Sequence, residues 1–386
     1  MIAMARPDIG ELEIELVNRV LRSEFLSMGQ MTVEFEQALA GYVGSPQAVA
    51  VSSGTAGLHA LIRAYGIGPG DEVITSSFSF VATANAILYE RARPVFVDIE
   101  PEHYGLDPEL VEAAITPRTR AIIAVDVFGH PCRLLELRDI ARRHGLYLID
   151  DSCEALGAEV LLQEGGHPGF VRLGNACLAD AAVFAFFPNK QITTGEGGMI
   201  VTGDDDLARL CRSLRNQGRG EGDHWLDHER LGYNYRLDEM SAAVGLGQLR
   251  RIDELLAKRT RVAALYQVRL AGVEGIQVPR VAGNVRMSWF VYVIRLDSAI
   301  DRDAVMARLG ERGIPTRPYF RPIHLQPFYR EMFGYRGGEL PETEAAGRSC
   351  LALPFHGRLT GDEVDTVAGA FAATTVGCPV GKGRGR

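Results

Sequence analysis

One lysine stands where an apolar stretch ends, in the segment FAFFPNKQITTGEGGMIVTG at residues 184–203. The residues before Lys190 are typical of a buried strand, and the glycine-rich turn after it leads into a second apolar run. A surface lysine can lie in such a place with its stem along apolar neighbours and its amine in water. A lysine desolvated in a pocket would instead keep part of its amine neutral, and a neutral amine can form a Schiff base with a carbonyl compound.

Two adjacent aspartates, Asp150 and Asp151, follow the apolar strand pattern LYLI. Ligands of parallel α/β sheets bind at the carboxyl ends of the strands, which is where this pair would lie. One of the two can cap the segment that follows. A pair placed directly after a buried strand predicts that at least one of them has another role.

A turn of small residues, in VSSGTAGLHAL at 51–61, leads from a strand pattern into a helical pattern. The free amides and the dipole of a helix N-terminus suit a phosphate group. The turn has neither the lysine of a Walker loop nor the G-x-G-x-x-G pattern of dinucleotide sites, so on its own it equally fits an ordinary strand–helix connection. A phosphate cup, a strand-end carboxylate and a pocket lysine are together what pyridoxal phosphate requires of a protein.

Alternating strand and helix patterns from residue 49 to about 216 must position these residues. Several of the strands are apolar throughout, as expected when helices cover both faces of a mostly parallel sheet. Asp107 is expected to cap one helix and Gly145 to end another. The glycine-rich stretch 161–180 is expected to leave the sheet as an irregular excursion.

The C-terminal third has a different pattern, which indicates a second, smaller unit. A long helical pattern at 237–270 is expected to link it to the first, and strand and helix patterns follow near 288–296, 301–312 and 361–372. We therefore predict three parts. These are a large cofactor-binding domain over 1–240, a linking helix with a small C-terminal domain over 241–376, and a disordered tail over 377–386.

The composition argues against several classes of protein. The chain has 386 residues, which suggests two domains, and its net charge of −8 argues against a nucleic-acid partner. Six scattered cysteines without a Cys-x-x-Cys pair predict neither a zinc site nor a disulfide framework. Because no apolar run is long enough to span a membrane, we expect a cytoplasmic protein without a membrane partner. His224 and His228 have the i, i+4 spacing of metal pairs, but no third ligand suggests itself, so no metal is predicted.

Blocks of sequence along nearly the whole chain carry a resemblance to one known family. They are FLSMGQMTVEFEQALAGYVG, SSGTAGLHAL, FSFVATANAI, PVFVDIEPE, DDSCEALGAE, FFPNKQITTGEGGMI, LGYNYRLDEMSAAVGLGQL, RPYFRPIHLQPFY and LPFHGRLTGDEV. In these blocks, and in their order, the chain resembles the sugar aminotransferases of the DegT/DnrJ/EryC1/StrS family. The resemblance implies an α/β protein of the aspartate aminotransferase-like fold type I. Such a protein has a large domain with a mostly parallel sheet and a smaller α+β C-terminal domain.

The resemblance also implies roles for particular residues around pyridoxal 5′-phosphate. Lys190 forms the Schiff base with its aldehyde, and Asp151 pairs with its pyridinium nitrogen by a charge-assisted hydrogen bond. Gly54 and Thr55 donate to its phosphate. Phe80 stacks on the ring, although a phenylalanine in this position is otherwise an ordinary core residue.

One implied role involves a second copy of the chain. Asn234 of the GYNYR block would reach the phosphate bound by the partner subunit, which implies a homodimer with shared active sites. From the residues alone, Asn234 is equally a turn residue.

Two positions depart from the family pattern. Glu154 stands near the ring hydroxyl, where Gln or His is usual, and a carboxylate beside a phenolate is repulsive unless one of them holds a proton. Glu154 is therefore either protonated or directed elsewhere. Ala185 stands five residues before Lys190, where a serine often donates to the phosphate. Relatives that remove a sugar hydroxyl carry His in place of the lysine, so Lys190 favours transamination.

The resulting functional hypothesis is an aminotransferase that moves an amino group from L-glutamate to a keto-sugar nucleotide, a 4-keto-6-deoxy NDP-hexose. The alternatives are an aminotransferase for a cyclic ketone such as an inosose, and a non-catalytic regulator that binds pyridoxal phosphate. An anionic substrate needs cationic partners, although each arginine can equally be a solvated or salt-bridged surface residue. The candidates are Arg219, Arg236, Arg317, Arg321 and His324.

Overall fold

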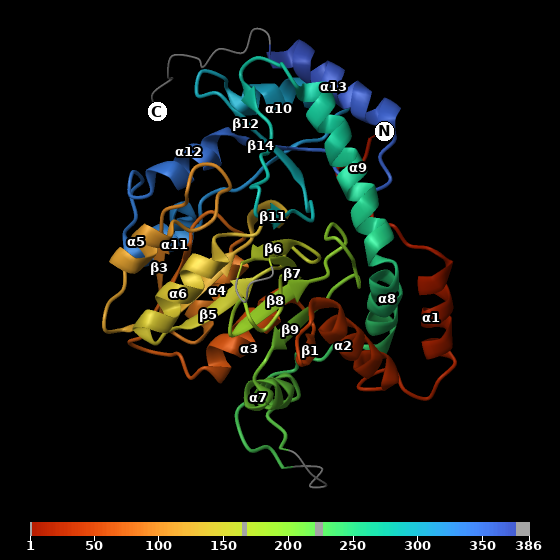
Figure 1. Cartoon of the computed structure of the whole chain (residues 1–386), viewed down its shortest axis with the longest axis vertical. Helices are drawn as coiled ribbons and strands as arrows, with labels where there is room; N and C mark the ends of the chain where they lie inside the picture. Colours follow the sequence, from red (N-terminus) through yellow and green to blue (C-terminus); the bar gives the residue numbers. More distant parts are fainter. Residues whose placement is uncertain (1, 164–167, 221–226, 376–386) are drawn as a thin grey trace.

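A computed structural model of the chain describes residues 2–163, 168–220 and 227–375 (Figure 1). Its centre is a seven-stranded sheet in the order β1-β9-β8-β5-β4-β2-β3. The pairs from β3 across to β8 are parallel, whereas β9 runs antiparallel to both β8 and β1, so the predicted mostly parallel sheet is confirmed. The strands are β1 (Gln47–Val51), β2 (Glu72–Ser76), β3 (Arg93–Val97), β4 (Thr119–Val125), β5 (Tyr147–Asp151), β8 (Ala181–Ala185) and β9 (Gly198–Thr202).

Helices cover both faces of this sheet. Alternate residues of the strands point to opposite faces, so they contribute to separate apolar cores. One face packs against α3, α4 and α7, and the other packs against α2, α5, α6 and α8. The bounds are α1 (Glu11–Leu21), α2 (Gln30–Val43), α3 (Gly54–Ala64), α4 (Ala82–Tyr89), α5 (Pro108–Ala113), α6 (Leu134–His144), α7 (Asp205–Arg215) and α8 (Glu239–Arg250). Asp107 caps α5 through the Glu109 amide, and Gly145 ends α6 with a left-handed φ of 63°, both as predicted.

The helical pattern predicted over 237–270 forms two helices, α8 and α9 (Ile252–Leu270), which meet at Arg251. Figure 1 shows them one after the other, rising from the level of α1 and α2 to α13. Because α8 and the first turn of α9 pack in the core of the large unit and the rest of α9 packs in that of the small one, the passage between the units falls inside the predicted helix.

The smaller unit is built on an antiparallel sheet in the order β10-β12-β14-β13. Its elements are β10 (Ile276–Gln277), β12 (Tyr292–Leu296), α10 (Arg302–Glu311), β13 (Arg317–Pro318), the 3-10 turn η3 (Ile323–Leu325), α11 (Pro327–Phe333), α12 (Pro341–Ser349), β14 (Cys350–Leu353) and α13 (Gly361–Thr375). The first residues of the chain join this unit, because Ile2 packs against its core and the Phe355 amide donates to the Met4 carbonyl. The large unit therefore does not include the whole N-terminal segment.

The excursion expected to be irregular contains regular structure on both sides of residues 164–167, which lie outside the described residues. Its strands β6 (Glu159–Leu162) and β7 (Gly169–Arg172) pair with each other, and β6 also pairs with β11 (Val285–Arg286). This correction has a long-range cause, because the third strand comes from a segment more than 100 residues later in the chain. The predicted tail, 377–386, also lies outside the described residues.

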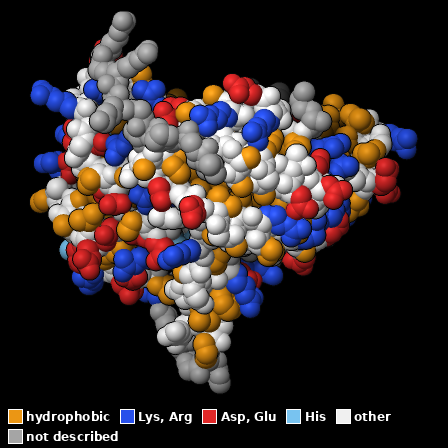
Figure 2. Space-filling model, turned by 90° about the horizontal axis from the view of Figure 1, so that it is seen from above, with side chains coloured by type: hydrophobic (Ala, Val, Ile, Leu, Met, Phe, Trp, Pro, Cys, Tyr) orange, Lys and Arg blue, Asp and Glu red, His pale blue; other side chains and the backbone are white. Residues whose placement is uncertain are grey.

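The molecular surface carries charged side chains of both signs. On the face seen in Figure 2, basic and acidic side chains are interspersed with apolar ones, and no basic stripe crosses that face. In the part of the chain that the structure describes, no helix is both long and apolar enough to cross a membrane.

Candidate active site

The residues singled out for chemistry lie around the carboxyl ends of the parallel strands. Asp151 ends β5, Lys190 follows β8 by five residues, and α3 begins three residues after β1. Strands β5 and β8 are hydrogen-bonded neighbours in the sheet, so the topology brings Asp151 close to the start of the lysine loop. The fold therefore assembles the predicted site at the edge where α/β sheets bind ligands.

Asp151 is a buried carboxylate that is aligned from α4. Thr83 Oγ1 donates to Asp151 Oδ2 over 2.7 Å, and Ser79 Oγ lies 2.9 Å from Thr83 Oγ1. The Cys153 amide approaches Asp151 Oδ1 at 3.3 Å. Only 4% of Asp151 is exposed, and within the described ranges no Lys, Arg or His forms an ion pair with it. A buried carboxylate without a cation is costly, so the position fits a positively charged ring nitrogen.

The turn before α3 offers free amides, as a phosphate site requires. Ser53 caps the helix by accepting from the Ala56 amide at 3.1 Å, which leaves the Gly54 and Thr55 amides without a partner inside the helix. A side chain at position 54 would place its Cβ 2.8 Å from both Ala185 Cβ and Cys153 Sγ, so the close packing requires glycine. Ala185 thus lies against the cup and contributes no hydrogen-bond donor to it.

Lys190 is held on a loop that folds back on β8. Thr193 Oγ1 and the Thr194 amide both bond the Phe186 carbonyl, at 2.9 and 3.0 Å. The lysine side chain is only 13% exposed, and its Nζ lies 3.9 Å from the centre of the Phe290 ring. The amine is therefore desolvated against an aromatic face and has a fixed backbone, which fits covalent capture of an aldehyde.

Glu154 points toward Lys190 and toward a backbone amide. Its Oε1 lies 3.5 Å from Lys190 Nζ, and its Oε2 accepts from the Phe128 amide at 2.9 Å. Phe128 has a φ of 62°, a left-handed conformation that is unusual for a non-glycine residue. Burial raises the pKa of Glu154 above its ordinary value, while the charge of Lys190 and the Phe128 amide act in the opposite direction. The side chain is directed at Lys190 and the Phe128 amide, and the protonation of Glu154 stays a prediction.

Several residues of this arrangement were not identified from the sequence. Thr83 lies about one helical turn after Phe80. A hydroxyl this close to a residue expected at the cofactor can orient a strand-end carboxylate, and this signal could have been used. Phe290 and Arg259 are about 70 or more residues from Lys190, and no local pattern connects them with it. Tyr319 lies near Glu154, and burial followed by that carboxylate raises the pKa of its phenol to about 12.

Phe80 is the only one of the predicted ring contacts that is largely open, with 63% of its surface exposed. Its carbonyl accepts from the Thr83 amide at 3.2 Å, so the segment that carries it is tied to the residue that aligns Asp151. The interpretation of Phe80 as a core residue is wrong. Its role against the cofactor ring stays a prediction.

The predicted substrate residues fall into two surface groups. In the first, Asn216 pairs with Asn234 as an isolated bridge, and Arg236 Nη1 donates to Asn216 Oδ1 at 3.0 Å. Asn234 is exposed, and Arg219 is half-buried on the adjoining segment. In the second group, Arg317 and Arg321 are exposed near β13. These placements leave the roles of the four arginines and of Asn234 as predictions.

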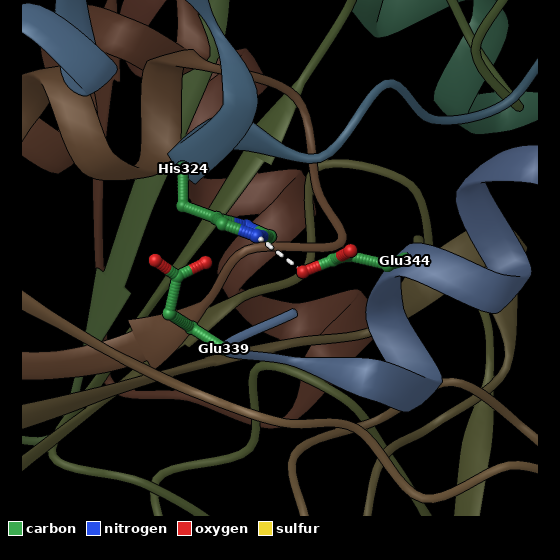
Figure 3. A group of neighbouring side chains, drawn as sticks. All are labelled: His324, Glu339 and Glu344. Atoms are coloured by element: carbon green, nitrogen blue, oxygen red, sulfur yellow. Dashed lines mark hydrogen bonds and ion pairs between the residues drawn. The ribbon is translucent and has the colours of Figure 1, made fainter. Parts of the chain in front are cut away.

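His324 is not placed to bind a substrate, and that prediction is wrong. The side chain is fully buried, with Nδ1 at 2.7 Å from Ser77 Oγ and Nε2 at 3.2 Å from Glu344 Oε1 (Figure 3). Both ring nitrogens are thus occupied by partners from β2's end and from α12. The RPYFRPIH block contains arginine, aromatic and histidine side chains, which were all candidates for substrate binding. Only the packing in the folded protein shows that the histidine is buried.

His324 also forms, with Glu339 and Glu344, a group whose ligand atoms lie within 4.8 Å of one another (Figure 3). The carboxylate oxygens of Glu339 and Glu344 already accept hydrogen bonds from backbone amides of the loop at 336–338. The Gly338 amide donates to Glu344 Oε1 at 2.6 Å, and the Arg336 and Gly337 amides donate to the Glu339 carboxylate. The group is therefore satisfied as a polar cluster. Of the histidine pair considered for a metal, His224 lies outside the described residues, and His228 Nδ1 bonds the Gln217 carbonyl.

A cavity of about 1210 Å³ lies between the two units. Residues of η1 (Val127–Gly129), β12 and α10 line it, whereas Lys190, Asp151 and Phe80 do not. The chemistry of the side chains, and not the size of the cavity, locates the candidate active site.

A pyridoxal-phosphate-dependent transaminase is the class of enzyme that this fold and this arrangement of Lys190 and Asp151 define. The match to the family model extends over residues 7–372. The chain belongs to the DegT/DnrJ/EryC1/StrS aminotransferase family.

Individual relatives cover nearly the whole chain. It is 40% identical over 375 residues to GDP-perosamine synthase of Caulobacter vibrioides, with 96% of this chain and 97% of that protein covered. Among solved structures, DesV of S. venezuelae in complex with a ketimine intermediate has 37% identity and a TM-score of 0.86, covering 94% of this chain and 93% of that one. PseC of Helicobacter pylori, an aminotransferase in the biosynthesis of pseudoaminic acid, has 28% identity and a TM-score of 0.91, covering 97% and 99%.

Proposed function

We propose that the enzyme transfers an amino group from L-glutamate to a keto-sugar nucleotide, a 4-keto-6-deoxy NDP-hexose, for amino-sugar biosynthesis. The observation that carries the proposal is the placement of Lys190, desolvated against Phe290 and 3.5 Å from Glu154, at the strand edge where Asp151 is aligned. The 40% identity with GDP-perosamine synthase supports a nucleotide-linked sugar as the acceptor.

Four residues of the chain have distinct proposed roles around the cofactor. Bound pyridoxal phosphate supplies an aldehyde that carries the amino group and a ring that withdraws electrons. Asp151 would hold the positive ring nitrogen, and the amides of Gly54 and Thr55 would hold the phosphate. Lys190 Nζ, as a free amine, would remove the proton from the reacting carbon of the donor and return a proton to that of the acceptor.

The exposed cationic side chains suit the diphosphate of such an acceptor. Arg317 and Arg321 lie on the same segment as Tyr319, whose pKa is raised first by burial and then by the charge of Glu154, so this segment runs from the neighbourhood of Glu154 to the surface. Arg219 and Arg236 belong to the group around Asn234. We propose that they act together with Asn234 at the site of the partner subunit.

A screen of donors and acceptors tests the reaction. Adding L-glutamate should convert the yellow, lysine-bound cofactor to its amino form, and only a competent ketone should restore the yellow species. Restoration by a 4-keto-6-deoxy NDP-hexose, and not by an inosose, supports the proposal. Restoration by the inosose alone would replace it with the cyclic-ketone alternative, and a cofactor that never exchanges with any donor would favour a non-catalytic regulator.

The shared active site is tested with two inactive variants. Lys190→Ala and Asn234→Ala are each expected to lose activity in homodimers. After mixing and subunit exchange, about a quarter of the wild-type activity should return, because half of the dimers are hybrids and each hybrid has one intact site. No recovery from demonstrably exchanged subunits would place Lys190 and Asn234 in the same subunit's site.

A further inference from the structure

Three buried polar side chains beside Asp151 are not used by the proposed reaction. Asp126 and Asp150 are fully buried, and Ser152 is 1% exposed. Ser152 Oγ lies 2.7 Å from Asp126 Oδ2 and also 2.7 Å from Asp150 Oδ2. The three residues are at the ends of the neighbouring strands β4 and β5, where the Asp126 amide approaches the Asp151 carbonyl at 3.3 Å.

The number of protons in this cluster follows from the two distances. A serine hydroxyl has one proton, so it can donate to only one of the two carboxyl oxygens. The other oxygen, at the same distance, must be a donor to Ser152 Oγ, because two acceptors this close in a dry interior repel each other. An ionised carboxylate has no proton to donate. At least one of the two aspartates is therefore a neutral carboxylic acid.

The second oxygen of each carboxyl group shows which aspartate holds the proton. Asp126 Oδ1 accepts from the Cys132 amide at 2.8 Å. Asp150 Oδ1 is buried and has no hydrogen-bond partner in the described part of the chain. A negative charge is consequently supported on Asp126 and unsupported on Asp150. Burial raises the pKa of both carboxyl groups. The negative charge of Asp126 raises the pKa of Asp150 further, whereas bonds from Asp150, the Cys132 amide and Ser152 lower the pKa of Asp126, in agreement with this assignment.

We infer that Asp150 is a neutral acid that donates to Ser152 Oγ, which donates in turn to Asp126, and that this chain of bonds makes Asp150 a positioning residue for Asp151. An ionised Asp150 would add a like charge next to Asp151 and would favour protonation of Asp151. The neutral acid leaves Asp151 as the ionised carboxylate at the end of β5. The inference rests on the proposed role of Asp151 at the cofactor's ring nitrogen.

The same bonds extend to the other side of the site. Asp126 Oδ1 closes the loop from Asp126 to Cys132, and the amide of Phe128 in that loop donates to Glu154. The cluster therefore fixes both the strand end that carries Asp151 and the loop that orients Glu154. The ionisable groups that face Asp150 are Asp126, Asp151 and Cys132, whose thiol has its pKa raised first by burial and then by Asp126 and Asp150.

Substitutions to asparagine separate an acid from a carboxylate. Asp150→Asn replaces the acid O–H with an amide N–H that can still donate to Ser152 Oγ, whereas Asp150→Ala removes the donor. We expect Asp150→Ala to weaken cofactor binding about tenfold, in line with the loss of one buried hydrogen bond, and Asp150→Asn to rescue it to within about threefold of wild type. The adjacent Asp151→Asn should cost about 10- to 100-fold, because there the charge itself is needed.

Two readouts test protonation directly and do not depend on the sugar acceptor. In infrared difference spectra between the two proteins, one carbonyl band of a buried neutral acid should be present in the wild type and missing in Asp150→Asn, whatever the protonation of Glu154. The pH profile of cofactor binding should be the same in both proteins, because no charge has been removed. A displaced profile, an unchanged infrared spectrum, or an Asp150→Asn variant as weak as Asp150→Ala would overturn the inference. If these results are obtained but the acceptor screen fails, only the proposed substrate is overturned.

Discussion

Arg259 provides the sharpest test of how the catalytic loop is held. Its guanidinium is buried in α9 and donates to four backbone carbonyls, those of Asn189 and Lys190 on one side and those of Trp289 and Phe290 on the other. No carboxylate forms an ion pair with it among the residues that the structure describes, and burial lowers its pKa to about 10. The cation thus joins the lysine loop to the segment before β12, whose Phe290 contacts Lys190 Nζ.

The cost of Arg259→Met follows from these four bonds. Each hydrogen bond to a charged group contributes about 1.5–3 kcal/mol, but the buried cation also loses several kcal/mol of hydration. Removing the guanidinium leaves four carbonyls without their donor, so we expect the free energy of unfolding to fall by about 3–5 kcal/mol, as when one partner of a buried charged network is removed. Loosening the Lys190 carbonyl alone amounts to about one such bond, or about tenfold in cofactor dissociation.

Arg261 is a matched control on the same helix. It is exposed and donates to the carbonyls of Gly357 and Leu359, so it bonds backbone groups of the small unit without contacting the lysine loop. Urea unfolding and cofactor titration of Arg259→Met, Arg259→Lys and Arg261→Met would be measured side by side. Arg261→Met should cost about 1 kcal/mol or less, with unchanged cofactor affinity. The reasoning is refuted if Arg259→Met loses stability yet binds the cofactor as tightly as the wild type.

Three further predictions concern single positions. Gly54→Ala should cost about 1–3 kcal/mol and weaken cofactor binding, because its Cβ meets Ala185 and Cys153 at 2.8 Å; Gly361→Ala, also at a helix start but with open space, should stay within about 0.5 kcal/mol in the same unfolding assay. Because the pKa of Glu154 is raised in the folded state, the contribution of this carboxyl to stability is present at low pH and is lost as the pH rises through its folded-state pKa. The glutamine of Glu154→Gln does not titrate, so the melting temperature of this variant relative to wild type should increase between pH 5 and pH 8. A constant difference would contradict this. His324→Gln should lose about 1–3 kcal/mol of stability while the substrate KM stays unchanged, since the ring bonds Ser77 and Glu344; a raised KM at full stability would return His324 to the substrate site.

The parts of the site that could be predicted from the sequence are those set by local pattern. Asp151 ends a buried strand and Lys190 lies on the loop after another, and the direction of a parallel sheet brings such strand ends to one edge. Asp107 and Gly145 were correct for the same reason, because a cap depends on its own few neighbours. For these residues the chemistry of the side chain and its place in the periodic pattern were sufficient.

What could not be predicted depends on partners that are distant in the chain. His324 is buried because Ser77 and Glu344, from two other elements, occupy its ring nitrogens. One strand of the excursion, β6, gains a second partner because a two-residue strand, β11, reaches it from a segment beyond α9. Arg259 was read only as part of a helical pattern. None of these long-range pairs has a spacing that a single sequence reveals.

The two buried contacts that sequence reasoning missed fix the smaller unit to the strand ends that carry the chemistry. Arg259 bonds the lysine loop to Trp289 and Phe290, at the entrance to β12. His324 bonds the segment before α11 to Ser77, directly after β2, and the Ile323 amide donates to the Ser77 carbonyl at 2.9 Å. A shift of the smaller unit would therefore move Phe290 against Lys190 Nζ and Tyr319 against Glu154 together. The position of that unit is thus a determinant of the environment of the lysine amine, and substitutions that loosen either contact should alter cofactor capture even though Arg259 and His324 are both buried.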